Sequence, residues 1–252
     1  MNVVISGASS GIGLALARHY LERGAKVAVF ARRGGLLQEL AAQYPGRVHA
    51  ASLDVRDSQA LLGAAREFIA HHGAPDIVIA NAGVSGGTLT EYAEDEEVFR
   101  HIMDTNVLGM VKTFRPFVAP MREARRGTLV GIASVAGFRG LPGSGAYSAS
   151  KAAAISYLES LRVELRGSGI RVVTICPGYI KTPMTDVNNF PMPFIIDADD
   201  AAQRMARVIA RGKSIAVVPW QMGLVGGVLK LLPNRLYDWA FSKAPRKVRK
   251  AT

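Results

Sequence analysis

Near its N-terminus the chain reads Ser6-Gly7-Ala8-Ser9-Ser10-Gly11-Ile12-Gly13, between a short apolar run at residues 3–6 and an amphipathic run at residues 11–23. Glycine allows a tight turn and a close approach of the backbone to a ligand, and the first turn of a helix offers free N–H groups to a phosphate. We therefore predict a strand, a phosphate-binding turn and a helix. The residues expected to contact a dinucleotide are Gly7, Ser9, Ser10, Gly11, Ile12 and Gly13. By itself the stretch leaves open a tight turn without a ligand. No Gly-Lys-Ser/Thr follows, so the loop is not that of a nucleoside triphosphatase.

The same alternation of apolar and amphipathic runs continues along the chain. The apolar runs are nearly continuous, which is typical of a parallel sheet covered by helices on both faces. We expect an α/β fold, a Rossmann-like doubly wound parallel sheet of about seven strands with helices on both faces. The predicted strands are residues 3–6, 26–30, 48–53, 76–80, 127–133, 170–176 and 214–219. The predicted helices are residues 11–23, 36–44, 58–72, 94–121, 147–166 and 198–211.

The length suits one α/β domain. We expect residues 1–220 to form a single domain that binds the cofactor and carries the catalytic residues. A long irregular segment, residues 179–197, is predicted to lie over the site as a lid. Residues 221–252 are predicted to be a basic, amphipathic extension, because residues 230–252 hold seven basic side chains and one acidic one, a net charge of +6 out of +11 for the chain.

The composition excludes several classes of protein. The 252 residues include one cysteine, Cys176, so no intrachain disulfide forms, and we expect Cys176 to be a small buried side chain. The five histidines lack the spacing of a metal site. No signal peptide or convincing membrane span is visible, and no nucleic-acid-binding motif accompanies the basic charge. We expect a cytoplasmic protein without a metal or a nucleic-acid partner.

The end of the second predicted strand bears on the choice of cofactor. An NAD site places an acid there to bond the ribose 2′-hydroxyl, whereas this chain has Arg32 and Arg33. A permanently charged, planar guanidinium suits a 2′-phosphate, so the sequence favours NADP(H). The alternative is that both arginines are solvated charges at a strand end.

A tyrosine and a lysine lie four residues apart on the helix predicted at residues 147–166. Tyr147 and Lys151 therefore share one face of that helix. A nearby ammonium favours the phenolate and lowers the pKa of a phenol, which makes Tyr147 a candidate proton donor. A surface pair at helical spacing would look the same.

Taken with these motifs, the ordered set across residues 1–220 resembles the short-chain dehydrogenase/reductase (SDR) family. Asn81-Ala82-Gly83 is similar to the family's Asn-Asn-Ala-Gly, with Ala80 in place of the first asparagine. Asn106, Ser134, Tyr147 and Lys151 resemble its catalytic tetrad. The resemblance further implies cofactor contacts at Asp54 and Val55, and, around the nicotinamide, at Pro177, Gly178, Ile180 and Thr182, besides Tyr147 and Lys151.

The resemblance also implies roles for the tetrad. Ser134 would hydrogen-bond the substrate oxygen and Tyr147 would protonate it. Lys151 would lower the pKa of the tyrosine and hold the nicotinamide ribose, and Asn106 would anchor a water that passes protons to Lys151. Other roles remain open from the residues alone. Asp54 can cap the following helix, Asn106 can mark a kink or a cap, and Ser148 and Ser150 look like serines at a helix start.

The predicted lid is rich in apolar residues, among them Met184 and the run at 190–196, and Leu141 and Pro142 precede Tyr147. These favour a lipophilic carbonyl or alcohol substrate, and ordinary packing of the lid is the alternative. The apolar sets after residue 221, broken at Pro233, fit either an interfacial helix on an anionic membrane, here the inner face of the cell membrane, or an arm on a partner subunit. The resemblance implies a homodimer or homotetramer built on the helices at 94–121 and 147–166.

The expected function is an NADP(H)-dependent oxidoreductase that transfers a hydride between the nicotinamide and a carbonyl or secondary alcohol. Within that class, a lipophilic 3-oxo compound competes with a steroid- or polyol-type substrate. A non-catalytic NADP(H)-binding regulator, or a membrane-associated scaffold that uses residues 222–252, is the alternative function. An intact set of Ser134, Tyr147 and Lys151 favours the enzyme.

Overall fold

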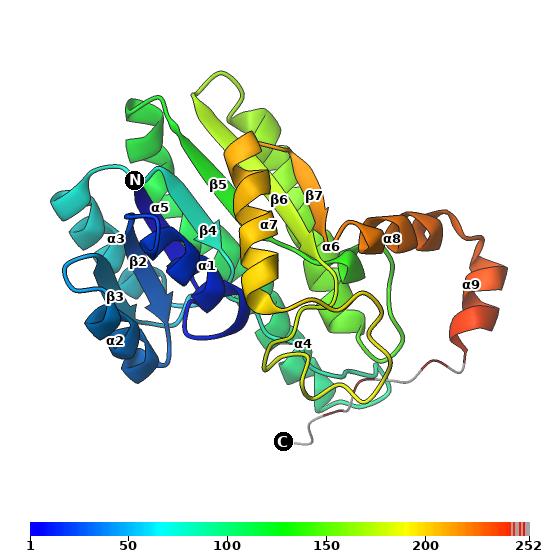
Figure 1. The fold of residues 1–252 in the computed structure, drawn as a ribbon. Helices are drawn as coiled ribbons and strands as arrows, with labels where there is room; N and C mark the ends of the chain where they lie inside the picture. Colours follow the sequence, from blue (N-terminus) through cyan, green and yellow to red (C-terminus); the bar gives the residue numbers. More distant parts are fainter. Residues whose placement is uncertain (243, 245–246, 248, 250–252) are drawn as a thin grey trace.

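One sheet of seven parallel strands runs through the computed structural model, which describes residues 1–242, 244, 247 and 249. The strand order is β3-β2-β1-β4-β5-β6-β7 (Figure 1). The strands are β1 (Asn2–Ser6), β2 (Lys26–Ala31), β3 (Val48–Ser52), β4 (Ile77–Ala80), β5 (Gly127–Ile132), β6 (Ile170–Pro177) and β7 (Ile215–Val218). The residues of the five central strands are mostly buried because both faces of the sheet are covered, which explains their continuous apolar runs, whereas the edge strands β3 and β7 are partly exposed.

Helices pack on both faces of the sheet. On one face, Leu16 and Met205 from two helices share a core with the sheet, and on the other face Phe114 and Leu158 do the same. The helices of the domain are α1 (Gly11–Leu21), α2 (Gly34–Gln43), α3 (Ser58–His72), α4 (Asp95–Met103), α5 (Gly109–Glu123), α6 (Gly145–Glu164) and α7 (Ala198–Arg211). The predicted doubly wound fold is confirmed, with most element ends within two residues of the expected ones.

The register of the sheet brings the ends of the central strands together. Ser6 at the end of β1 lies opposite both Phe30 of β2 and Ala80 of β4, and Ala80 lies opposite Gly131 of β5. The strand order reverses between β1 and β4, and open α/β sheets bind ligands in the crevice at such a point. The residues that follow these strand ends therefore meet at one edge.

The long helix predicted at residues 94–121 is divided by a π-helical turn, Asp104–Leu108, that lies between α4 and α5. Asn106 in this turn is 1% exposed. Periodicity cannot reveal such a turn, because it changes the register of a helix by one residue and leaves both flanking helices amphipathic.

Two short helices follow the sheet, α8 (Gln221–Leu231) and α9 (Asn234–Phe241), separated at Pro233 as expected. They project from the body of the molecule beyond β7 (Figure 1). Within the described residues, every helix is too short or too polar to span a bilayer. The division into a domain at 1–220 and an extension at 221–252 stays a prediction.

Candidate active site

The glycine-rich turn between β1 and α1 packs closely against the segment after β4. Gly7 has φ +70°, and a Cβ atom there would lie 2.7 Å from Cα of Ala82. A Cβ atom on Gly13 would lie 2.3 Å from the carbonyl oxygen of Gly7. The Asn81 side chain holds the turn, donating from Nδ2 to the carbonyl oxygens of Ser6 and Gly7, both at 3.1 Å. Only glycine therefore fits at these two positions.

The first turn of α1 is open to an anion. Ser10 is the N-cap residue and makes no side-chain cap hydrogen bond, so it does not occupy the N–H groups of that turn. Helix N-terminal N–H groups and the helix dipole together favour a phosphate. The turn has the geometry that the sequence predicts for a pyrophosphate site.

Arg33 lies over the glycine-rich turn. Its Nη2 atom donates to Ser9 Oγ at 3.0 Å and to Ser10 Oγ at 2.6 Å, and its Nε atom donates to Ser9 Oγ at 3.3 Å. Arg32 is exposed and also lines the cleft. Two hydroxyl groups thus hold Arg33 beside the turn. A charge that is merely solvated at a strand end would not make these hydrogen bonds.

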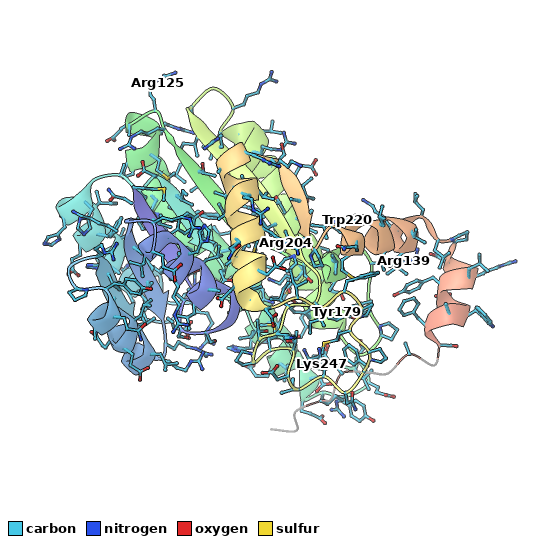
Figure 2. The ribbon with its side chains drawn as sticks, in the orientation of Figure 1. Arg125, Arg139, Tyr179, Arg204, Trp220 and Lys247 are labelled. Carbon is cyan, nitrogen blue, oxygen red and sulfur yellow. The ribbon has the colours of Figure 1, made fainter. Side chains whose placement is uncertain are left out.

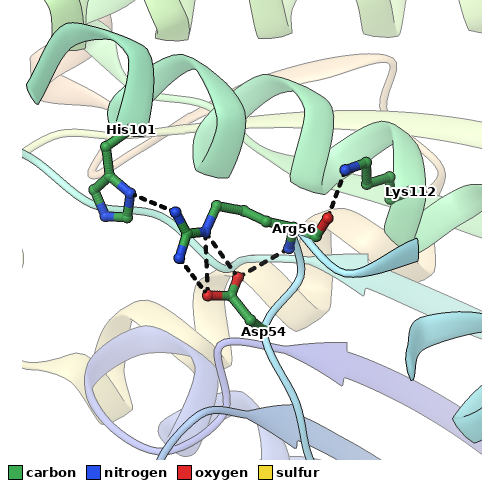
Figure 3. Close-up of polar contacts among 4 residues, drawn as sticks. All are labelled: Asp54, Arg56, His101 and Lys112. Atoms are coloured by element: carbon green, nitrogen blue, oxygen red, sulfur yellow. Dashed lines mark hydrogen bonds and ion pairs between the residues drawn. The ribbon is translucent and has the colours of Figure 1, made fainter. Parts of the chain in front are cut away.

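Asp54 follows β3 and is bound by a neighbour on its own loop (Figure 3). Arg56 donates from Nη2 to Asp54 Oδ2 at 2.8 Å and from its backbone N to Oδ1 at 2.9 Å. The side-chain hydrogen bond from Arg56 lowers the pKa of Asp54. The cap of α3 is instead Asp57, whose Oδ1 accepts from the backbone N of Gln59 and Ala60, so the capping role considered for Asp54 is wrong.

Ser134, Tyr147 and Lys151 converge at the carboxyl end of β5. Ser134 is buried at the N-cap of a short 3₁₀ turn (Val135–Gly137), where its Oγ accepts from the backbone N of Ala136 at 3.1 Å. Tyr147 and Lys151 lie one turn apart on α6, with Lys151 Nζ 5.7 Å from the centre of the tyrosine ring. Lys151 is 4% exposed, and its Nζ donates to the carbonyl oxygen of Ile132 at 2.9 Å.

Burial shifts the pKa of both titrating groups away from charge. It raises the pKa of the Tyr147 phenol, and a hydrogen bond with Ser134 partly offsets the rise. Burial lowers the pKa of Lys151 to about 8. The net direction for Tyr147 is opposite to the one expected from the sequence, because the loss of hydration on burial outweighs the hydrogen bond with Ser134. A lowering of the tyrosine pKa by Lys151 stays a prediction for the cofactor-bound enzyme.

Asn106 supports the site from behind the cleft. Its Nδ2 donates to the carbonyl oxygen of Val84 at 2.9 Å and to Ser150 Oγ at 3.0 Å, while its Oδ1 accepts from the backbone N of Val84 at 2.8 Å. Ser150 in turn donates to the carbonyl oxygen of Tyr147 at 2.7 Å. Ser150, which looks from the sequence like a serine at a helix start, connects Asn106 to the backbone of Tyr147.

One cleft of about 310 Å³ at this edge of the sheet gathers nearly all of the predicted site residues. Gly13 and Asn106 are not among the residues that line it. The predicted residues that line it are Gly7, Ser9, Ser10, Gly11, Ile12, Arg32, Arg33, Asp54, Val55, Asn81, Ala82, Gly83, Ser134, Tyr147, Lys151, Pro177, Gly178, Ile180 and Thr182. Residues distant in the sequence thus form one surface.

Some lining residues were not predicted from the sequence. Those that it missed are Ala31, Leu53, Val84, Thr105, Ile132, Ala133, Pro183 and Thr185. Thr105 is of interest because its Oγ1 is buried and has no hydrogen-bond partner among the described residues. Thr105 lies next to Asn106 in the π-helical turn, which helical periodicity does not reveal, so the sequence does not predict its place in the cleft.

The lid prediction is met in part. Residues between Gly178 and α7 form an irregular segment, whose two ends are joined by an isolated bridge between Ile180 and Ile196. Pro183 and Met184 line the cleft. The run at 190–196, Leu141 and Pro142 do not, so the apolar residues that favoured a lipophilic substrate lie mainly outside the cleft. Cys176 is fully buried, and burial raises the pKa of its thiol to about 12.

Two basic residues of the C-terminal extension lie against the body of the chain. Arg249 donates from Nε to Asp95 Oδ2 and from Nη2 to Glu94 Oε1, both at 2.8 Å, and stacks over the ring of Tyr92. Lys247, labelled in Figure 2, donates to Ser85 Oγ at 2.8 Å. The expected basic end was solvated or bound to a membrane, whereas these two side chains contact the segment after β4 and the start of α4. The basic residues at 243, 246 and 250 lie outside the described residues.

The residues of the cleft fit a nicotinamide dinucleotide. The N–H groups of the first turn of α1 are not occupied by a side-chain cap, and Arg32 and Arg33 line the cleft with that turn. The hydroxyl of Thr105, which also lines the cleft, has no partner among the described residues. These features supply donors for phosphates and hydroxyl groups where the fold places a dinucleotide.

Comparison with known proteins gives consistent results. A family model described as short chain dehydrogenase matches residues 1–191. An uncharacterized oxidoreductase of Myxococcus xanthus (strain DK1622) is 45% identical over 240 residues, covering 94% of each chain. A 3-oxoacyl-(acyl-carrier-protein) reductase of Chlamydia muridarum (strain MoPn / Nigg) is 33% identical over 186 residues, covering 72% of this chain and 75% of that one. The solved closed form of serine dehydrogenase complexed with NADP+ has a TM-score of 0.79 and 26% identity, covering 86% of this chain and 94% of that one.

Proposed function

The chain belongs to the short-chain dehydrogenase/reductase family of nicotinamide-dependent oxidoreductases, and on that premise we propose that it is an NADP(H)-dependent enzyme that interconverts a lipophilic carbonyl compound and its secondary alcohol. The observation that carries this proposal is the convergence of Ser134, Tyr147 and Lys151 in the cleft that also contains the glycine-rich turn. Acid–base groups and a phosphate-binding turn in one cleft are what a dinucleotide-dependent reaction requires.

The residues of the cleft would divide the work as follows. When bound, the nicotinamide supplies a hydride to the carbonyl carbon or accepts one in the reverse direction. Ser134 donates a hydrogen bond to the substrate oxygen and stabilises its developing negative charge. Tyr147 donates its phenolic proton to that oxygen, and Lys151 stabilises the resulting phenolate and holds the cofactor ribose. Asn106 positions α6 through Ser150 and, as the proposed anchor of a water, returns a proton toward Lys151.

Arg33 supports the choice of NADP(H) over NAD(H). Its guanidinium is held beside the glycine-rich turn by Ser9 and Ser10, and all three side chains can donate to a 2′-phosphate. Arginine pairs with phosphate through two parallel hydrogen bonds, which a ribose 2′-hydroxyl cannot accept. The similar solved structure of serine dehydrogenase is a complex with NADP+, which also favours NADP(H) for this chain. Asp54 and Val55 would meet the adenine end, and Pro177, Gly178, Ile180 and Thr182 the nicotinamide end.

A lipophilic 3-oxo compound is the substrate class that we favour. Pro183 and Met184 give the cleft an apolar border next to the reacting groups, and the similar Chlamydia muridarum protein is a 3-oxoacyl reductase. A steroid or a polyol would fit the same chemistry. We further propose a cytoplasmic homodimer or homotetramer, with the C-terminal extension in contact either with the inner membrane surface or with a partner subunit.

The test is a panel of ketones, 3-oxo esters and aldehydes of increasing chain length, each read as consumption of NADPH and, in parallel, of NADH. We expect turnover with NADPH that rises with chain length. The Tyr147→Phe variant should lose about a hundredfold to ten-thousandfold of kcat while it keeps its affinity for NADPH. Unchanged turnover in Tyr147→Phe would refute the catalytic assignment, and affinity for NADPH without turnover in the unmodified enzyme would favour the non-catalytic alternative.

A further inference from the structure

We propose that α8 and α9 form a platform that docks on the surface of an anionic phospholipid bilayer. The platform is built around an apolar ridge of six residues, which are Trp220, Leu224, Val228, Leu231, Leu236 and Trp239. Neither helix is long enough to cross a bilayer, so the platform would lie in the plane of the membrane interface.

The residues of the ridge are well exposed, and those of α8 follow one side of the helix. Trp220, Leu224, Val228 and Leu231 follow one another at intervals of four, four and three residues, which places them on one side of α8. Their exposed fractions are 64%, 64%, 63% and 85%, and Trp239 on α9 is 80% exposed. Side chains of this size are rarely exposed as a contiguous set unless they meet a partner or a membrane.

The opposite side of α8 fastens the platform to the body, so the ridge is directed outward. Met222 packs on Gly178: a Cβ atom on Gly178 would lie 2.4 Å from Met222 Cγ. Gly226 packs on Phe138: a Cβ atom on Gly226 would lie 2.5 Å from the phenylalanine ring. Both Met222 and Gly226 are buried, in contrast to the ridge residues one turn away.

The turn between the two helices is held in place by Arg139. Figure 2 shows this side chain between α8 and α9, and Trp220 at the start of α8. Arg139 donates to the carbonyl oxygens of Leu229 and Leu232 and to Asn234 Oδ1, and its guanidinium lies 4.1 Å from the ring centre of Tyr237. The platform is therefore a fixed part of the fold rather than a frayed end, and the ridge is presented in one orientation.

Charge favours a bilayer as the occupant. On α8 and α9, Lys230 and Arg235 are exposed beside one exposed acid, Asp238, so the charge of the two helices is net positive. Cations flanking an exposed apolar surface with tryptophan suit anionic headgroups, whereas the cores of protein interfaces are depleted of lysine. Both tryptophans of the chain lie on the ridge, and indole rings prefer the boundary between headgroups and acyl chains.

The platform lies next to the substrate end of the cleft. Gly178 lines the cleft and contacts Met222 of α8. This part of the inference rests on the proposed function: docking would hold the cleft beside a bilayer, in which a lipophilic carbonyl substrate is concentrated.

The test uses the full-length chain and vesicles of either phosphatidylcholine alone or a mixture with phosphatidylglycerol. Because both tryptophans belong to the ridge, intrinsic indole fluorescence reports on it directly. We expect a blue shift and co-sedimentation with the anionic vesicles, both weaker at high salt and with the neutral ones. The variant Leu224→Ser/Val228→Ser/Leu231→Ser should bind anionic vesicles at least about tenfold more weakly, and Lys230→Glu/Arg235→Glu should lose the preference for anionic lipid.

Leu36→Ser is the control, because Leu36 is 36% exposed on α2, outside both the platform and the helices expected to join subunits, and its replacement should not change vesicle binding. Equal binding by the unmodified chain and the triple variant would overturn the inference. A second result would also overturn it: the unmodified chain does not respond to vesicles, and the triple variant has a lower mass in solution than the unmodified chain. The ridge would then join two copies of the chain. NADPH turnover with a water-soluble ketone is measured in parallel: docking without turnover rejects only the proposed function, and turnover without docking rejects only the platform.

Discussion

In the proposed reaction, Lys151 is the residue whose charge would set the working pH of the site. Its ammonium is buried between α6 and β5, and the carbonyl oxygen of Ile132 is its hydrogen-bond acceptor. Burial alone brings the pKa of Lys151 down to about 8. A lysine that must stay protonated to stabilise a phenolate is therefore poised within reach of physiological pH.

The first prediction concerns this pKa. We expect kcat/KM for ketone reduction to fall as the pH rises through about 8, because Lys151 loses its proton there. The same shift should make the free energy of unfolding increase with pH between about 8 and 10.5, since the unfolded chain binds a proton that the folded chain has released. A pH–rate profile and denaturant titrations measure both. A rate that stays flat to well above pH 9 would contradict the prediction.

The second prediction concerns Arg33. Replacing it with alanine removes the guanidinium that Ser9 and Ser10 hold beside the phosphate turn. We expect Arg33→Ala to raise KM for NADPH roughly tenfold to a hundredfold and to leave KM for NADH nearly unchanged, because a charged hydrogen bond is lost only with the 2′-phosphate. Arg23→Ala is the control, because Arg23 lies outside the cleft and its guanidinium donates to the carbonyl oxygen of His19 at the end of α1. A parallel rise in both KM values would show that Arg33 does not read the 2′-phosphate.

At the level of elements, the π-helical turn is the feature that shapes the site. It inserts one residue between α4 and α5 and turns Asn106 inward, toward Val84 and Ser150. π-Turns are rare and are often found at functional sites. Here the hydrogen bond from Asn106 to Ser150 joins the turn to α6, which carries Tyr147 and Lys151.

The third prediction tests how α8 is fastened. In Gly226→Ala the new Cβ atom would meet the Phe138 ring, so we expect a loss of about 1–3 kcal/mol in the free energy of unfolding. Gly227→Ala is the matched control, because nothing lies within 4 Å of a Cβ atom there. Alanine should stabilise that helical position by about 0.5–1 kcal/mol. Chemical denaturation of both variants measures the difference, and equal effects would mean that α8 does not pack on Phe138.

At the level of the whole molecule, two residues of the C-terminal extension, Lys247 and Arg249, contact the segment after β4 and the start of α4. Arg249 joins Asp95, which is 4% exposed and also accepts from the backbone N of Leu89, to the end of the chain. Hydrogen bonds from Arg249 lower the pKa of Asp95, and those from Arg249 and its own backbone N lower that of Glu94. Depressed carboxyl pKa values stabilise the folded form above the unfolded pKa, and this contribution disappears as the pH falls below it.

The fourth prediction tests this contact by proteolysis. We expect Asp95→Asn to increase the rate at which trypsin cleaves the basic extension, because asparagine keeps the acceptor for Leu89 and loses the charge that holds Arg249. Glu96→Gln on the same helix turn pairs only with Arg100 and serves as the control. In the unmodified chain the cleavage rate should be low at neutral pH. If Glu96→Gln raised the cleavage rate as much as Asp95→Asn, the rate would depend on the total charge of α4 and not on the contact with Arg249.

The sequence by itself determined the sheet, its parallel strands and most of the lining of the cleft. Apolar runs separated by amphipathic ones require a covered sheet, and the glycines at 7 and 13 lie where backbone atoms pack too closely for a side chain. The spacing of Ser134, Tyr147 and Lys151 places them at one strand end and on one helix face. Such signals are local, and local geometry can be read from periodicity and residue type.

Only the tertiary structure decided the rest. The π-helical turn, the bond from Asn106 to Ser150 and the unpartnered hydroxyl of Thr105 depend on how α4, α5 and α6 meet. The same holds for the direction of the Tyr147 pKa shift, because burial is a property of the folded molecule and not of a motif. Whether a basic tail is solvated or paired depends on where acidic side chains lie in space, and Arg249 meets Asp95 across more than half of the chain.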